Sequence, residues 1–201
     1  MNVLAVGAHP DDIELGCFGV MAKHHLRGDK IFGVIITNGE LGFNAQKRIK
    51  ESRIAAKQID MNLLFGEFPD GNLQENSALV SFLDNIIKKK KIDVMYTHTE
   101  HDRHQDHISV AKASISAGRK LTELYSYETP SVNYGFHPQL FIDITKTLQK
   151  KILAIKKHKS QKNKIYTRID ATKGIAKFRA YQCGLPKRFC ESFEVHKIVN
   201  I

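Results

Sequence analysis

The chain has 201 residues, of which 42% are hydrophobic, so it can bury one core, and we expect a single domain over residues 1–201. It shows neither an apolar stretch of about 18 residues, which would indicate a membrane span, nor a secretory leader, so we expect a cytoplasmic protein. The net charge of +10 comes without any nucleic-acid-binding signature, and the three cysteines lack CxxC spacing, so neither a nucleic-acid partner nor a thiolate zinc site is expected.

The lysines gather in two segments of the chain, residues 88–91 and 146–164. A solvated basic face is the simplest interpretation of such runs. Attraction of a phosphorylated or nucleotide-linked substrate, or binding to an acidic polymer, are the alternatives that the charge leaves open.

Short apolar runs alternate with helical patterns along the chain. The apolar runs predict strands at residues 2–8, 30–37, 61–65, 92–98, 121–127 and 140–144. The helical patterns cover residues 16–27, 45–59, 76–90, 106–118, 146–158 and 168–182. This alternation predicts an α/β fold with a Rossmann-like, doubly wound, mostly parallel sheet flanked by helices.

The first chemical motif, AHPDD, follows the first predicted strand and carries His9, Asp11 and Asp12. Imidazole and carboxylate together suit zinc. A structural alternative is that Asp12 only caps the next helix, with Asp11 favouring its positive end.

A second cluster, HTEHDRHQDH, follows the strand predicted at residues 92–98. It contains four histidines and two aspartates: His98, His101, His104, His107, Asp102 and Asp106. Ligands of an open α/β sheet lie beyond the carboxyl ends of its strands, so we expect the two clusters to meet there. A catalytic zinc takes three protein ligands, and His9, Asp12 and one histidine of the second cluster would hold one zinc ion per chain.

Six short motifs occur together in one order along the chain: AHPDD at 8–12, TNGELG at 37–42, RIKE at 48–51, PDG at 69–71, HQDH at 104–107 and HKSQ at 158–161. In this combination the sequence resembles the PIG-L (LmbE-like) family of zinc-dependent N-acetylglucosamine deacetylases. The resemblance covers roughly residues 2–161, and no family motif can be aligned beyond about position 165.

The resemblance implies that His9, Asp12 and His107 bind zinc, that Asp11 is the general base and that His104 stabilises the oxyanion. The implied reaction is removal of an N-acetyl or similar small acyl group from a small amino-sugar substrate, glycoside- or nucleotide-linked, by metal-activated water.

The resemblance also implies sugar contacts by Arg48 and Asp70. Alternatives from the residues alone are a surface ion pair of Arg48 with Glu51 or Glu40, and a tight turn around Asp70. Glu40, beside a glycine-containing turn, is a candidate for lining the pocket.

The stretch at 128–138 lacks periodicity and carries aromatic side chains. We expect it to cover the pocket, with an aromatic face for a sugar ring and with His137 as a further catalytic or substrate contact. The alternative is a plain surface connection.

Two other functions fit parts of the sequence. A phosphoester hydrolase would benefit from the basic surface, but such sites often use paired metals, and the sequence offers good ligands for one. A non-catalytic module that binds sugar or nucleic acid would not need Asp11 beside the ligands. The oligomeric state is open, because no interface can be read from the sequence, and an oligomer is possible.

Overall fold

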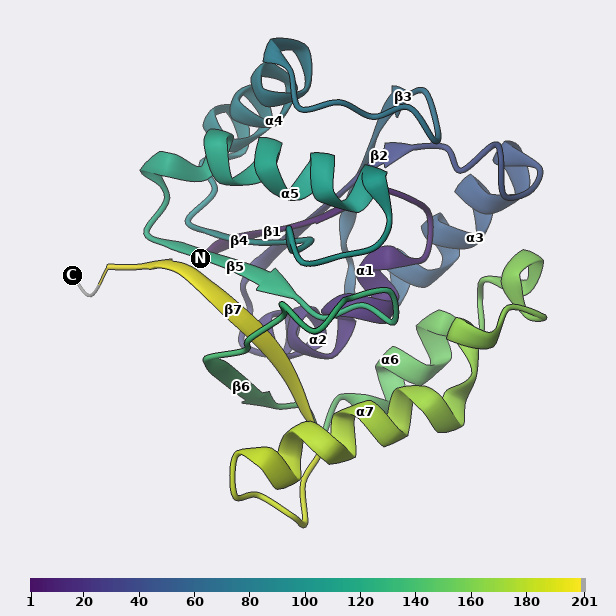
Figure 1. Cartoon of the computed structure of the whole chain (residues 1–201), viewed down its shortest axis with the longest axis vertical. Coiled ribbons are helices and arrows are strands. Elements are labelled where there is room, and N and C mark those ends of the chain that lie inside the picture. Colours follow the sequence, from purple (N-terminus) through teal and green to yellow (C-terminus); the bar gives the residue numbers. More distant parts are fainter. Residues whose placement is uncertain (200–201) are drawn as a thin grey trace.

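The structure, a computed structural model, describes residues 1–199 and centres on one seven-stranded sheet (Figure 1). The strand order is β3-β2-β1-β4-β5-β7-β6. The strands are β1 (Asn2–Gly7), β2 (Lys30–Thr37), β3 (Asn62–Phe68), β4 (Val94–Thr97), β5 (Glu123–Tyr127), β6 (Leu140–Asp143) and β7 (Cys190–Ile198). The first five pair in parallel, and β7 runs antiparallel to both β5 and β6. The predicted mostly parallel, doubly wound sheet is therefore confirmed.

Helices cover both faces of this sheet, as Figure 1 shows. They are α1 (Asp12–Gly16), α2 (Phe18–Leu26), α3 (Ala45–Ala56), α4 (Ser77–Lys90), α5 (Gln105–Ala117), α6 (Leu148–Ile155) and α7 (Ile169–Gln182). Along β1, Val3 and Ala5 join the apolar layer beneath α2, α3 and α6, whereas Leu4 and Val6 join the layer beneath α4 and α5. Burial on both faces explains why the strand is apolar at nearly every position.

The chain differs from the predicted elements in two places. The helix predicted at 16–27 corresponds to α2, and a separate short helix that was not predicted, α1, precedes it with a break at Cys17. The strand β7, which lies in the last part of the chain, was not predicted. Its sequence, CESFEVHKI, mixes buried acidic and apolar residues, so neither a continuous apolar run nor a strict alternation marks it.

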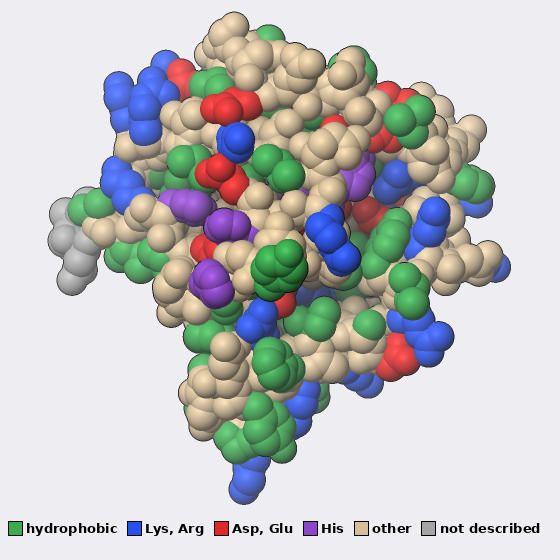
Figure 2. Space-filling model, viewed as in Figure 1, with side chains coloured by type: hydrophobic (Ala, Val, Ile, Leu, Met, Phe, Trp, Pro, Cys, Tyr) green, Lys and Arg blue, Asp and Glu red, His purple; other side chains and the backbone are tan. Residues whose placement is uncertain are grey.

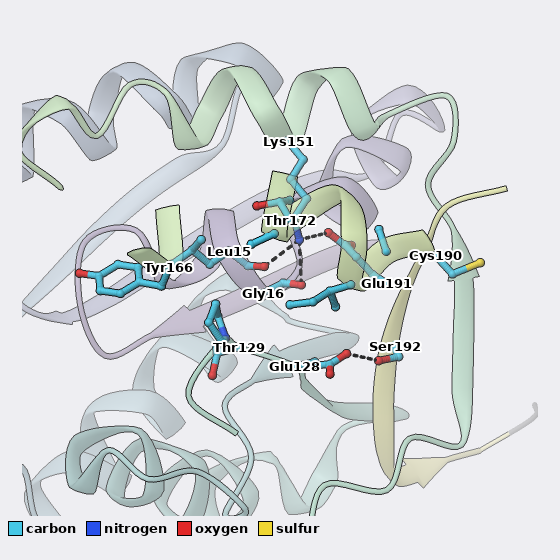
Figure 3. A pocket seen from close by; sticks show the side chains of 14 residues that line it. Leu15, Gly16, Glu128, Thr129, Lys151, Tyr166, Thr172, Cys190, Glu191 and Ser192 are labelled. Atoms are coloured by element: carbon cyan, nitrogen blue, oxygen red, sulfur yellow. Dashed lines mark hydrogen bonds and ion pairs between the residues drawn. The ribbon is translucent and has the colours of Figure 1, made fainter. Parts of the chain in front are cut away.

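A buried ion pair bridges the break between α1 and α2 (Figure 3). The ammonium group of Lys151, from α6, donates to the carbonyls of Leu15 and Gly16 at 2.7 and 3.3 Å and to Glu191 Oε1 at 2.6 Å. Glu191, from β7, in turn accepts from two backbone N–H groups at the start of α2, at 2.9 and 2.8 Å. Lys151 is therefore not part of a solvated basic face, contrary to the interpretation of the 146–164 run.

Within residues 1–199, every helix is too short or too polar to cross a lipid bilayer.

Candidate active site

The two motifs meet because the strands that precede them are neighbours. β1 pairs with β4 in the middle of the sheet, and the strand order reverses at this point, with β2 and β3 on one side and β5 on the other. A parallel sheet opens a crevice at the carboxyl ends of such neighbouring strands. The segment after β1 brings His9 to Asp12 into this crevice, and the segment after β4 brings residues 98–107.

His9, Asp12 and His107 form one compact cluster, which we call the metal triad. One ligand atom from each lies within 4.8 Å of the others, and all three side chains are buried. His9 Nδ1 is 3.4 Å from Asp12 Oδ2, and His107 Nε2 is 3.4 Å from Asp12 Oδ1. Asp12 is the first residue of α1 and His107 lies in the first turn of α5, so two helix starts hold two of the three side chains.

Carboxylates hold the other ring nitrogen of each histidine of the metal triad. Asp102 Oδ2 lies 3.0 Å from His107 Nδ1. Asp70 Oδ1 and Asp106 Oδ2 lie 3.0 and 3.2 Å from His9 Nε2. Zinc-binding histidines usually have a carboxylate or carbonyl on the second nitrogen, which fixes the ring and raises its basicity. The donor set and its supports therefore fit a zinc ion.

The charge balance of the cluster also favours a cation. Although burial opposes protonation, hydrogen bonds with Asp106, Asp12 and Asp70 raise the pKa of His9 to about 12. Burial likewise opposes protonation of His107, but the charge of Asp12 and the hydrogen bond with Asp102 raise its pKa to about 9. The carboxylates thus stabilise positive charge at the place where the ligand atoms converge, and a divalent ion would satisfy the same demand.

Asp11 lies beside the metal triad but faces a different neighbour. Its backbone has φ 109°, a left-handed conformation that is uncommon for residues other than glycine. Its Oδ1 is 3.4 Å from Arg48 Nη2, and its buried Oδ2 has no hydrogen-bond partner within the described residues. Burial, followed by the charge of Asp12, raises the pKa of Asp11 to about 7. A carboxyl of this kind can both accept and release a proton near neutrality.

His104 lies at the N-cap of α5, beside both histidines of the metal triad. Its ring centroid is 4.7 Å from that of His9 and 4.6 Å from that of His107. Its Nδ1 accepts from the backbone N–H of Asp106 at 3.2 Å. Burial, followed by the charges of His107 and His9, lowers the pKa of His104, which favours the neutral ring. With Nδ1 accepting, the proton of the neutral ring is on Nε2.

Arg48 is buried and braces the loops that follow β1 and β2. Its Nη1 donates to the carbonyl of Gly39 at 3.0 Å, and its Nη2 donates to the carbonyl of Pro10 at 2.6 Å. Gly39 has φ +66°, and a Cβ atom there would collide with the Arg48 guanidinium, so glycine is required at this turn. The surface ion pair considered for Arg48 does not form: the Glu51 carboxylate binds Ser160 instead.

Asp70 and Glu40 hold the loops around the site. Asp70 is in the cleft wall, where its Oδ2 accepts from Leu41 N at 2.9 Å while Oδ1 faces His9. Glu40 is exposed, is not among the residues that line the cleft, and accepts from Asp70 N at 2.9 Å. The expectation that Glu40 lines the pocket is therefore not met, because its side chain turns to support the backbone of the PDG turn.

The cleft that opens onto the metal triad has a volume of about 810 Å³. The stretch at 128–138 contributes only its first part to the wall, through Thr129, Pro130 and Ser131. Tyr134 is 99% exposed, and His137 is exposed and donates its backbone N–H to Glu194. The structure thus places no aromatic face of this stretch in the cleft, and it places His137 outside it.

Some residues of the site were not assigned a role from the sequence. His98 is fully buried, with its Nε2 3.1 Å from Asp12 Oδ2 and its ring stacked on His107 at 3.9 Å. Gln161 and Tyr166 line the cleft from the segment before α7. His98 lies in the histidine cluster that the sequence shows, but Tyr166 lies beyond the last recognisable motif.

A smaller cavity of about 60 Å³ adjoins the cleft (Figure 3). Both share Leu15, Thr129 and Tyr166 in their walls, and the smaller one also contains the Lys151–Glu191 pair. The ion pair therefore contacts the C-terminal end of α1, the helix that begins with Asp12, and lines a cavity next to the cleft.

Comparison with known proteins finds a family model and a relative that match this sequence. The sequence model of the PIG-L family, described as GlcNAc-PI de-N-acetylase, matches residues 4–118, which run from β1 to the end of α5 and include the metal triad. The uncharacterized deacetylase YaiS of Escherichia coli K12 is 39% identical over 169 residues, which cover 79% of this chain and 91% of that protein.

Solved structures share the fold at low sequence identity. N,N′-diacetylchitobiose deacetylase from Pyrococcus horikoshii has a TM-score of 0.85 and 21% identity, with 96% of this chain and 83% of that one covered. GalB, the 4-carboxy-2-hydroxymuconate hydratase from Pseudomonas putida KT2440, has a TM-score of 0.85 and 18% identity, with 100% and 98% covered. Because one fold carries both reactions, the fold alone does not define the chemistry. The family match over residues 4–118 of 201 and the similarity to YaiS show that this chain belongs to the PIG-L family.

Proposed function

We propose that this protein is a zinc-dependent hydrolase that removes an acetyl or similar small acyl group from the nitrogen of an amino sugar, glycoside- or nucleotide-linked. The observation that carries the proposal is the metal triad, with a carboxylate on the second nitrogen of each histidine and with Asp11 beside it. The relatives support the same reaction class through their names, as a GlcNAc-PI de-N-acetylase family and a diacetylchitobiose deacetylase.

His9, Asp12 and His107 would hold one zinc ion. When bound, zinc supplies Lewis acidity, which makes water more acidic and polarises the amide carbonyl. Asp102, together with Asp70 and Asp106, keeps the two rings oriented for this task.

Asp11 would move the proton in the reaction. It takes a proton from the water that attacks the carbonyl carbon, and it delivers that proton to the nitrogen as the C–N bond breaks, leaving a free amine and a carboxylic acid that then loses its proton to solvent. The raised pKa of its buried carboxyl suits both steps. Arg48 holds the loop that carries Asp11 through its bond to Pro10.

His104 would stabilise the oxyanion. Its Nδ1 is occupied by the backbone N–H of Asp106, so the neutral ring offers Nε2–H as the donor. The cleft volume of about 810 Å³ falls within the usual range for small-molecule sites and is sufficient for a substituted amino sugar.

The test is acetate release from free, glycosidic and nucleotide-linked N-acetylglucosamine, measured with zinc-loaded protein and after treatment with a chelator, alongside metal analysis. We expect acetate and free amine in equal amounts, activity that depends on metal, and one zinc per active chain. Two metals per active chain together with phosphate release from a phosphoester would identify a phosphoesterase instead, and no acetate from any amino sugar would refute the proposal.

A further inference from the structure

Two of the three cysteines lie next to each other, away from the cleft. Cys183 is the C-cap of α7, and Cys190 is the first residue of β7. Both are free thiols, and their sulfur atoms are 3.9 Å apart. We propose that this pair is a redox modification site, where the two thiols form a reversible disulfide by exchange with a small-molecule disulfide such as glutathione disulfide.

The loop between α7 and β7 brings the two thiols together. Gly184, with φ 78°, reverses the chain after α7, and its N–H donates to Tyr181 O at 3.0 Å. Leu185 N donates to Ala180 O at 2.8 Å, and Arg188 N donates to Leu185 O at 2.9 Å. A disulfide bond is about 2.04 Å long, so the sulfurs must approach each other by about 2 Å. Rotation of the two side chains about their Cα–Cβ bonds supplies a movement of this size.

The two thiols differ in exposure, and this difference sets the order of the exchange. Cys183 is half-buried, whereas Cys190 is 1% exposed. Burial, followed by the charge of the neighbouring Cys183, raises the pKa of the Cys190 thiol to about 12. The thiolate is the attacking form of cysteine, so Cys183 is the residue that reacts first with a dissolved disulfide.

The exchange consists of two steps. In the first, the Cys183 thiolate attacks one sulfur of glutathione disulfide, a mixed disulfide forms, and one glutathione thiolate leaves. In the second, the Cys190 thiolate attacks the sulfur of Cys183, the protein disulfide forms, and the second glutathione thiolate leaves. The two cysteines are oxidised and glutathione disulfide is reduced to two glutathione molecules, whose thiols take up the two protons that the cysteines lose. Because Cys183 carries no charge in the mixed disulfide, it no longer opposes the ionisation of Cys190.

The surface around Cys183 favours the approach of glutathione disulfide, which carries a net negative charge near neutrality. Residues 177–190 contain four lysine or arginine side chains and neither aspartate nor glutamate. Lys177 lies over the loop, since its ammonium group donates to the carbonyl of Pro186 at 2.6 Å. Figure 2 shows lysine and arginine side chains among hydrophobic ones at the projecting end of the molecule, which α7 and the following loop form. Positive charge of this kind raises the local concentration of an anion.

The bond would join two elements that otherwise only pack together. α7 begins beside the cleft, where Ala171 forms part of the wall, and it ends at Cys183. Cys190 leads into Glu191, whose carboxylate holds the start of α2. The disulfide would therefore tie the far end of α7 to the central sheet. Since neither thiol lines the cleft, the site is independent of the proposed deacetylation.

The test treats the folded, fully reduced protein with glutathione disulfide and follows its thiols by mass spectrometry. Alkylation of the product after denaturation should label only Cys17, which is fully buried, whereas the reduced chain should take up three labels. Trypsin cleaves the loop after Lys187 and Arg188. The disulfide should therefore hold together two peptides, residues 180–187 and 189–197, which dithiothreitol separates.

Variants separate the two steps of the exchange. Cys190→Ser should stop at the mixed disulfide, with one glutathione on Cys183. Cys183→Ser should take up glutathione at least about tenfold more slowly, because its remaining thiols are buried. Cys17→Ala is the matched control, since Cys17 is also a free thiol but lies outside the pair, and it should form the linked peptides as readily as the unaltered chain. A thermal melt of each variant shows that it is folded.

Four results would overturn the site. They are the persistence of all three thiols, glutathione that stays on Cys183 without closure of the ring, linked peptides that contain Cys17, and a disulfide between two chains. The linked pair of peptides in the unaltered chain and in Cys17→Ala, together with its absence from both serine variants, supports the site.

Discussion

At the scale of single residues, the adjacent carboxylates Asp11 and Asp12 have different environments because the backbone turns between them. Asp12 is the first residue of α1 and faces His9 and His107, whereas the left-handed φ of Asp11 directs its carboxylate to Arg48. Uncommon backbone conformations cost free energy and tend to occur at functional sites. Among residues other than glycine, aspartate and asparagine tolerate this conformation best.

Asp11→Asn is therefore the substitution that isolates the proton-transfer role. Asparagine keeps the size and tolerates the positive φ, but it cannot accept a proton, so we expect kcat to fall by about 10²- to 10⁴-fold. Zinc content should stay at about one per chain, as for a residue outside the ligand set. Asp60→Asn, at an exposed aspartate with φ 49°, controls for the backbone. Loss of zinc from the Asp11 variant would mean that Asp11 is a ligand and that its assigned role is wrong.

His104→Asn tests the oxyanion role while preserving the start of α5. Asparagine is a favoured N-cap and can accept from Asp106 N as the histidine does. Its loss of the ring Nε2–H should cost about 2.7–4 kcal/mol of transition-state stabilisation, so kcat should fall about 10²-fold or more with little change in KM. Steady-state kinetics and a thermal melt on the same preparation provide the check. An unchanged kcat in a folded, zinc-loaded variant would remove His104 from the mechanism.

At the scale of elements, the short helix α1 is held by groups that lie far away in the sequence. Its last carbonyls are bound by Lys151 from α6, and the start of α2 is bound by Glu191 from β7. These two ends face each other across the break at Cys17. One ion pair therefore provides partners for backbone carbonyls at the end of α1 and for backbone N–H groups at the start of α2, which have no partner within their own helices.

Lys151→Met should consequently destabilise the fold. It leaves Glu191 as a buried carboxylate without its cation, for which the expected loss of unfolding free energy is about 3–5 kcal/mol. Urea denaturation measures it, and Lys156→Met, at the exposed end of α6, should change the free energy of unfolding little. Adding Glu191→Gln to Lys151→Met should restore part of the loss. A change below about 1 kcal/mol for Lys151→Met would show that the pair does not support α1.

At the scale of the whole molecule, a bound ion would link the two halves of the parallel sheet. His9 and Asp12 follow β1, and His107 lies on the helix that follows β4, so the metal triad joins segments that the chain separates by the whole β2–α4 region. Such a link exists only in the folded state, because an unfolded chain has no preformed site.

Zinc should therefore stabilise the folded protein as well as activate it. At a free zinc concentration of 100 Kd, mass action adds about 2.7 kcal/mol to the free energy of unfolding. Calorimetry should show a lower Tm after treatment with a chelator and recovery when zinc is returned, in parallel with activity. An unchanged Tm and undiminished deacetylation in protein shown to be metal-free would contradict the assignment of the metal triad.

The sequence alone determined the elements whose periodicity is local, and it determined the chemistry of the candidate metal ligands. Nearly continuous apolar runs predict β1, β2 and β4 because burial on both faces requires apolar side chains at successive positions. The motifs HPDD and HQDH predict a cluster of imidazole and carboxylate because parallel strands end at one edge. Local pattern is sufficient for these conclusions.

Only the tertiary structure decided which groups meet. Whether Asp70 supports His9, whether Lys151 is buried, and where His137 lies depend on the paths of loops and on packing between elements distant in sequence. The strand β7 enters the sheet between β5 and β6 for the same reason: its stability comes from partners on both sides and not from its own pattern. Periodicity describes which face of an element is buried, but it contains no information on what that face will contact.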